Sequence, residues 1–278
     1  MDMFGLRRIP ASALIGLVLT AAMVLTAVLA PWIAPFGNAD VVGDVWGPMT
    51  AKHWLGTDNL GRDLLTRMIY GARITLVIAG LATVLSFTMG ATLGFTAAVM
   101  GGWFDQWLSR GVDLLMAIPT LIFALVVLSV LPSSVTMLVL ILGILDATRV
   151  FRLSRAVAAD INVMEFVEAA RLRGEKTPWI VFREILPNAL TPLISELGLR
   201  FIFAVLFLSA LSFLGLGVQP PDADWGGMVK ENKEGIVFGI PAALIPAAAI
   251  AVLTISVNLV ADWILNRTSD LKGGRGNG

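Results

Sequence analysis

The sequence predicts an all-α membrane protein with about six transmembrane helices. Hydrophobic residues make up 57% of its 278 residues and charged residues only 14%, and the mean hydropathy is +0.83. Soluble domains carry about 25% charged residues. The apolar residues also lie in long charge-free runs, and one bilayer crossing needs about 20 apolar helical residues. Several of these runs are long enough to cross a membrane.

The charge-free runs give the expected spans. The run Leu114–Leu145 is too long for one span and is broken by Pro132-Ser133-Ser134, so we expect two spans there. The predicted spans are Ile9–Ala39 with its apolar core near Ala11–Ala30, Ile74–Phe104, Trp107–Leu131, Val135–Val150, Phe201–Pro221 with a start near Thr191, and Gly235–Ala261.

The first run could also be a signal peptide, because Arg7 and Arg8 precede it and Val28-Leu29-Ala30 resembles a cleavage site. Pro31 follows that site directly and the apolar run is long, so we interpret it as an uncleaved anchor.

Basic residues near the span ends predict the orientation, because Lys and Arg concentrate on the cytoplasmic side. They occur in three groups: Arg7 and Arg8; Arg149, Arg152, Arg155, Arg171, Arg173, Lys176 and Arg183; and Arg267, Lys272 and Arg275. All three groups are cytoplasmic only if even numbers of spans separate them. Six spans with both termini in the cytoplasm satisfy this condition.

Several chemistries are excluded. The chain has no cysteine and one histidine, which excludes disulfides, thiol catalysis, cysteine-ligated zinc and a histidine cluster for a metal. It also has no phosphate-binding loop of the G-x-x-x-x-G-K-[ST] type, so it cannot hydrolyse ATP by the usual route, and any energy from ATP must come from a partner. We expect residues 1–72 to form an N-terminal span and outer loop, and residues 73–278 to form the main domain.

A charged island, Glu168–Pro187, lies in the predicted cytoplasmic loop 151–190. Its caps predict two short helices: Asn162 begins the first and Gly174 ends it, and Thr177-Pro178 begin the second, which Pro187 stops. The residues alone support two interpretations equally. The segment is either a helix pair that rests on lipid headgroups or a docking element for a soluble partner. A DNA-reading helix-turn-helix is disfavoured because the net charge of 149–184 is only +2.

The motif EAARLRG followed by ILPNAL resembles the EAA loop of ABC-importer permeases. The matching residues are Glu168, Ala169, Ala170, Gly174, Leu186 and Pro187. The broader family has Ile two places before Leu, whereas this chain has Glu184 there, which resembles the dipeptide/oligopeptide/nickel branch. Three further stretches resemble the second permease type of that branch: His53–Leu76, Gly101–Pro119 and Leu211–Met228.

This resemblance implies a type I importer permease fold in the bacterial inner membrane, with those six residues coupling it to cytoplasmic ATPases. It also implies a second, similar permease, one or two ATP-binding subunits that carry ATP and Mg, an external binding protein, and neither a cofactor nor nucleic acid on this chain. Peptides are the expected substrate, with nickel, opines or another small solute as alternatives.

Three polar pairs near span ends are candidates for the translocation path or for structural pairing: Glu196 and Arg200, Asn258 and Asp262, and Asp146 and Arg149. We expect Glu196, Arg200 and Asn258 as possible path residues. An ion-coupled secondary transporter would need charge near the midplane, and a membrane aspartyl enzyme would need Asp146 and Asp262 together, so both alternatives are weaker.

Two other groups of residues are expected to be structural. In the first outer loop, the sequences Gly56-Thr57-Asp58 and Gly61-Arg62-Asp63 are typical of turns, and their Asp–Arg pairs are expected to hold the loop together. His53, the single histidine, is expected to be solvated or hydrogen-bonded. Gly90 and Gly94 form a G-x-x-x-G pair that predicts close helix packing.

Overall fold

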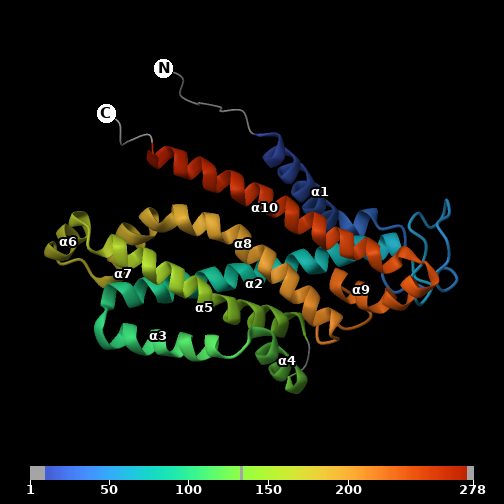
Figure 1. Ribbon diagram of the computed structural model, residues 1–278, viewed down its shortest axis with the longest axis horizontal. Coiled ribbons are helices and arrows are strands. Elements are labelled where there is room, and N and C mark those ends of the chain that lie inside the picture. The colour runs from blue at the N-terminus through green and yellow to red at the C-terminus, as the bar shows by residue number, and fades with distance from the viewer. Residues whose placement is uncertain (1–9, 132–133, 274–278) are drawn as a thin grey trace. The chain divides into compact units, whose positions relative to one another are not determined.

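The computed structural model describes residues 10–131 and 134–273, and in this part of the chain the regular elements are helices (Figure 1). Two isolated β-bridges, Val41 to Arg62 and Thr57 to Asp63, occur in the loop between α1 and α2. The chain divides into two compact units, which are described separately below.

The first unit comprises residues 1–76, 212–215 and 220–278. It contains α1 (Ala11–Ile33), the first turns of α2 (Leu64–Met100), α9 (Trp225–Asn232), the 3-10 helices η2 (Lys233–Phe238) and η3 (Pro241–Ala243), and α10 (Leu244–Gly273). Helices α1 and α10 lie side by side (Figure 1). They approach closely at Gly16, where a Cβ would lie 2.7 Å from the carbonyl oxygen of Ser256.

The second unit comprises residues 77–211 and 216–219. It contains the rest of α2, α3 (Gly102–Ala117), α4 (Thr120–Val130), α5 (Val135–Asn162), α6 (Glu165–Leu172), α7 (Thr177–Trp179), the π-helix η1 (Ile180–Ile185) and α8 (Leu186–Phe213). Helices α2 and α5 meet backbone to backbone: a Cβ at Gly90 would lie 2.6 Å from the Ala147 carbonyl oxygen, and one at Gly94 would lie 2.7 Å from that of Phe151. The predicted role of the G-x-x-x-G pair is confirmed.

Four helical stretches of the described residues are long and apolar enough to cross a membrane: 11–33, 64–100, 177–213 and 241–267. The pair α3 and α4 would make a fifth crossing, although the two helices are bent by 84° relative to each other. Helix α5 has 28 residues but carries Asp146, Arg149 and Arg152, which makes it less apolar than the other spans.

The bend between α3 and α4 interrupts the helix that was predicted over Trp107–Leu131. Pro119 disfavours the α conformation for the residue before it, and Ile118 accordingly has a ψ of 128° and ends α3. Of the predicted Pro132-Ser133-Ser134 break, Pro132 and Ser133 lie outside the described residues. Ser134 caps α5, its hydroxyl accepting a hydrogen bond from the Met137 N–H.

The second and sixth spans have different bounds from those predicted. Helix α2 begins at Leu64, ten residues before the predicted Ile74, and ends at Met100. Gly101 follows with a φ of 61°, so the predicted end at Phe104 lies in α3 instead. The predicted sixth span, Gly235–Ala261, begins as 3-10 helix, and α10 itself starts at Leu244.

The fifth span also differs, because one continuous helical stretch runs from Thr177 to Phe213 and Pro187 does not stop it. The reason is the π-helix that directly precedes Pro187. There the Leu186 N–H bonds to the Val181 carbonyl, five residues back. This wider turn leaves room for the Pro187 ring, which an α-helical turn would crowd. The predicted second short helix is therefore the beginning of a span.

Candidate functional site

The α6 segment, residues 163–176, is the structured form of the charged island. Its helix begins differently from the prediction: Met164 is the N-cap residue, and no side chain caps the helix. Asn162 is instead the last residue of α5. It does not cap α6, because its side-chain amide makes hydrogen bonds elsewhere. It donates to the Ala98 carbonyl at 3.2 Å and accepts a hydrogen bond from Arg171 at 2.6 Å. Asn162 thus links the α6 segment to α2.

The end of α6 agrees with the prediction. Gly174 has a φ of 82°, its N–H bonds to the Arg171 carbonyl at 2.9 Å, and the Glu175 N–H bonds to the Ala170 carbonyl at 3.2 Å. These two bonds form a Schellman motif, which satisfies carbonyls at the helix end. A Cβ at Gly174 would have no atom within 4 Å, so the backbone conformation is what favours glycine here.

The two faces of α6 have different surroundings. Val167 is fully buried in an apolar core that includes Phe95 of α2 and Ile185 of η1, and Ala170 is also fully buried. On the other face Glu168 and Ala169 are exposed. Large apolar side chains are exposed beside them: Leu172 is 84% exposed and Val163 is 82% exposed. The α6 segment therefore presents a mixed apolar and charged surface while its inner face anchors it.

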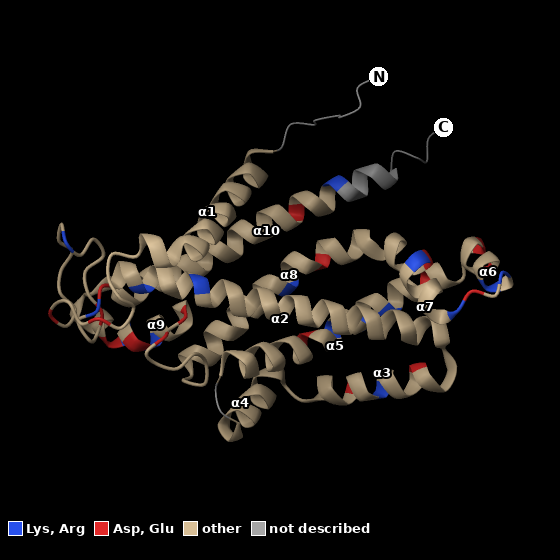
Figure 2. Ribbon diagram, turned by 180° about the vertical axis from the view of Figure 1, so that it is seen from behind, with Lys and Arg blue, Asp and Glu red and all other residues tan. Residues whose placement is uncertain are grey.

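Charged side chains also connect the α6 segment to η1. Figure 2 shows acidic and basic residues gathered around α6 and α7. Arg173 lies 3.5 Å from Glu184, and the Arg183 guanidinium lies over the Trp179 ring at 4.8 Å. The second helix begins one residue earlier than predicted, with Lys176 as its N-cap residue and Thr177 inside the helix.

The six predicted coupling residues fall into two groups. Glu168, Ala169, Gly174 and Pro187 are exposed, whereas Ala170 is buried and Leu186 is partly buried against the same apolar core. The buried members hold the segment in place, and the exposed members are available to a partner.

A second polar cluster joins α5 and α8. Arg200 pairs with Glu196, four residues before it on α8, at 2.6 Å, as the sequence allows. It also pairs with Asp146 of α5 at 3.1 Å. The sequence suggests Arg149 as the partner of Asp146. Local spacing cannot reveal the actual partner, because Asp146 and Arg200 are 54 residues apart.

The third predicted path residue, Asn258, lies on α10 in the first unit. Its side-chain amide donates to Asp262 at 3.2 Å, so the predicted pair forms. Within the described residues, no group of three or more His, Asp or Glu side chains is placed to hold a metal ion.

The loop between α1 and α2 contains a buried ion cluster. The Asp58 carboxylate accepts hydrogen bonds from the side chains of Arg62 and Arg67, each at 2.7 Å. Glu231 of α9 contacts both arginines. The expected stapling by Asp–Arg pairs is confirmed. The turn sequences do not predict that Arg67 and Glu231 join this cluster, because both residues lie outside them.

His53 belongs to the same loop. It is only 8% exposed, and its Nδ1 lies 2.9 Å from the Asp63 carboxylate. The expectation that this histidine is hydrogen-bonded is confirmed.

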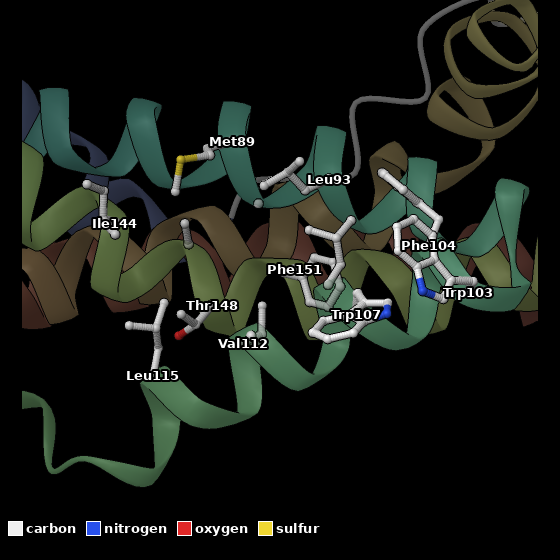
Figure 3. Close-up of a pocket in the computed structure, with 14 residues that line it drawn as sticks. Met89, Leu93, Trp103, Phe104, Trp107, Val112, Leu115, Ile144, Thr148 and Phe151 are labelled. Atoms are coloured by element: carbon white, nitrogen blue, oxygen red, sulfur yellow. The ribbon is translucent and has the colours of Figure 1, made fainter.

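An apolar groove of about 480 Å³ lies between α2, α3 and α5 (Figure 3). Its lining is aromatic and aliphatic, with Trp103 and Trp107 of α3 on one side and Met89 and Leu93 of α2 on another. No charged residue lines it. The groove is therefore a separate feature from the polar cluster of α5 and α8.

Comparison with known proteins identifies the family. Residues 90–270 match the family described as the binding-protein-dependent transport system inner membrane component. A dipeptide transport system permease protein of Alkalihalophilus pseudofirmus is 33% identical over 91% of this chain and 83% of its own length.

Two further relatives support the same assignment. A putative peptide transport system permease protein of Brucella suis is 39% identical over 90% of this chain and 84% of its own length. A glutathione transport system permease protein of Pectobacterium atrosepticum is 33% identical over 78% of this chain and 72% of its own length. The chain therefore belongs to the binding-protein-dependent transport system inner membrane component family, as a multi-pass inner-membrane permease subunit of an ABC importer with no catalytic activity or cofactor of its own.

Proposed function

We propose that the chain forms half of the translocation path of a peptide importer. Its similar relatives are named for transport of dipeptides, peptides and glutathione, and all of these solutes contain peptide bonds and carboxylates. As a component of a binding-protein-dependent system it works with a binding protein and an ATPase. The finer assembly that we propose adds a second, homologous permease and one or two cytoplasmic ATP-binding subunits, which hold ATP and Mg.

We propose six spans with both termini in the cytoplasm. The four apolar stretches and the bent pair α3–α4 are long and apolar enough for up to five crossings, and α5 is the candidate for the sixth. Its 28 residues are about 42 Å long. Its Asp146 is paired with Arg200 and its Arg149 is stacked on Phe203, so the charges in its middle are partly compensated. The α6 segment, which carries Arg171, Arg173 and Lys176, then lies in the cytoplasm.

We propose that Glu168, Ala169, Ala170, Gly174, Leu186 and Pro187 couple the permease to its ATPase. The observation that carries this proposal is the division of α6 into two faces. One face is anchored in the core of the second unit, and the other exposes Glu168 between large apolar side chains. A helix that is fixed on one side and exposed on the other can transmit a movement of its partner to α5 and α8.

Substitutions on α6 test the coupling in the assembled transporter. Glu168→Arg should reduce substrate-stimulated ATPase activity about tenfold or more, because it places a cation in a contact built for an anion. Glu165→Arg is the matched control: Glu165 is also exposed and also lies in the first turn of α6, so its reversal has the same effect on the helix dipole. Gly174→Pro should likewise abolish stimulation.

Equal loss of stimulation in both glutamate variants would contradict a specific role for Glu168. Unchanged stimulation in Glu168→Arg or in Gly174→Pro would contradict the coupling assignment altogether. Membrane insertion of each variant should remain normal.

Single cysteines test the topology, and the absence of native cysteine makes each one unique in this chain. In intact cells, Lys176→Cys should be protected from membrane-impermeant thiol reagents. Met49→Cys, at an exposed position of the loop between α1 and α2, should be labelled. Labelling at position 176 would overturn the six-span arrangement.

A further inference from the structure

The charged residues in the middle of α5 and α8 are not equally compensated. Arg200 contacts two carboxylates, Asp146 at 3.1 Å and Glu196 at 2.6 Å. Asp146 is also enclosed, with only 5% of its side chain exposed. Arg200 is therefore an internal link between the two helices, and its charge is already neutralised.

Arg149 is in a different situation. Its guanidinium lies over the Phe203 ring, 4.3 Å from the centroid. Among the residues that the structure describes, it forms no direct ion pair within 4.0 Å, although Asp146, three residues before it on α5, interacts with it electrostatically. The side chain is partly exposed. A cation–π contact holds the plane of a guanidinium but leaves its N–H groups free to donate to an anion.

The depth of Arg149 makes this incomplete compensation informative. It lies about 21 Å along α5 from the first residue, in a helix of about 42 Å. Its partner Phe203 is about 15 Å from the end of α8. A partly exposed cation within a span is costly in lipid, and such residues usually face a protein interior or a water-filled cavity.

We propose that Arg149 faces the translocation path and binds the carboxylate of the passing solute, with the Phe203 ring fixing the guanidinium plane. An arginine fork matches a carboxylate through two parallel hydrogen bonds. The solute class is therefore carboxylate-bearing, and peptides with a free C-terminus fit it. This inference rests on the proposed importer function and assigns a specificity residue to it.

The cation–π contact also explains how the site releases its ligand. A transport site must bind weakly enough for the solute to leave. Arg149 keeps part of its stabilisation from Phe203 when no anion is bound, so its carboxylate contact need not be strong.

The first test measures accessibility in the complete transporter, reconstituted in liposomes with its other subunits. Arg149→Cys should react with a membrane-impermeant thiol reagent, and a carboxylate-bearing peptide on the loaded binding protein should slow the reaction. Ile144→Cys is the matched control. It lies on the same helix, about 140° around it, and is 40% exposed in the chain, but we expect it to resist the reagent.

The second test measures selectivity. Uptake of a dipeptide is compared with uptake of its C-terminal amide, each supplied on saturated binding protein. Arg149→Gln should reduce uptake of the free acid about tenfold and lower the ratio of acid to amide. Arg149→Lys should restore part of that ratio. Arg152→Gln should leave both uptakes unchanged, because Arg152 pairs with Asp113 in an exposed contact.

The outcomes separate this inference from the proposed function. If the wild-type transporter imports the dipeptide but the Arg149→Cys variant stays unlabelled, or if Arg149→Gln keeps the ratio of acid to amide, the role of Arg149 is refuted and the peptide importer stands. If the wild type imports no peptide, the proposed function fails, and labelling at position 149 still decides whether this residue faces water.

Discussion

The loop between α1 and α2 and the α6 segment are both rich in charge, but they use it in opposite ways. In the loop, Asp58, Arg62, Arg67 and Glu231 neutralise one another, and Arg67 is 1% exposed. In the α6 segment, Glu168 is exposed, and the attachment comes from buried apolar residues such as Val167 and from the Schellman motif. Charge holds the loop together, whereas apolar packing and backbone bonds hold α6.

This difference indicates where charge substitutions should affect folding and where they should affect partners. A buried ion that loses its counter-ion destabilises the fold. An exposed charge contributes little to stability, so a strong effect of its removal must come from a contact outside the chain. The following predictions measure the contrast, from the largest expected effect to the smallest.

Arg67→Leu should be the most destabilising change. Among the described residues it leaves Arg62 as the remaining ion-pair partner of the Asp58 and Glu231 carboxylates, and breaking a buried pair costs about 3–5 kcal/mol. We expect the midpoint of thermal unfolding to fall by about 10 °C. Arg73→Leu removes an exposed arginine from the same helix and should change the midpoint little. Equal effects of the two changes would show that the cluster is not stabilising.

Alanine substitutions at Gly61 and at Gly174 should destabilise the fold to different extents, although the two residues have similar φ angles. Gly61 and Gly174 have φ values of 78° and 82°. A Cβ at Gly61 would overlap the carbonyl oxygen of Gly43, whereas one at Gly174 meets no atom within 4 Å. Gly174→Ala should cost about 1 kcal/mol, the strain of a left-handed residue. Gly61→Ala adds overpacking and should cost about 3 kcal/mol. Denaturant unfolding of both variants measures the difference.

The third effect, at Asp224, should be visible as a pH dependence. Burial raises the pKa of this carboxyl to about 6 from its usual 3.8, although it accepts hydrogen bonds from the Gly226 and Gly227 N–H groups at the start of α9. As the pH rises, the unfolded state therefore loses this proton at a lower pH than the folded state does. Stability should fall as the pH rises from about 4 to 6, by at most about 3 kcal/mol.

Asp224→Asn should remove most of this slope, because asparagine can also cap α9 and does not titrate. Unfolding midpoints measured between about pH 4 and pH 7 compare the two proteins. A slope that persists in the variant would assign the pH dependence to another group.

Much of the fold was predictable because it depends on patterns within one segment. The charge-free run at Ala11–Ala30 corresponds to α1, and the G-x-x-x-G pair correctly predicts close packing of α2. Gly174 ends α6 as predicted, because a left-handed helix end has a local signal. The α6 segment itself was found from its charge and its resemblance to the EAA loop.

The errors have two physical causes. Pro119 and Pro187 have the same local chemistry, yet the first ends a helix and the second lies inside one, because the π-helix before Pro187 accommodates its ring. Proline alone does not distinguish these cases. The second cause is distance along the chain: the contacts of Arg200 with Asp146 and of Arg67 with Glu231 join residues more than 50 positions apart, which local spacing cannot reveal.

The continuous helical stretch of 37 residues from Thr177 to Phe213 sets a length scale for the molecule. At 1.5 Å per residue it is about 55 Å long, whereas the hydrocarbon core of a bilayer is about 30 Å thick. An upright helix would therefore project about 25 Å beyond the hydrocarbon. Since α6 packs against the first turns of this helix through η1, in the proposed six-span arrangement the projecting part would act as a spacer that fixes the height of the α6 surface above the membrane.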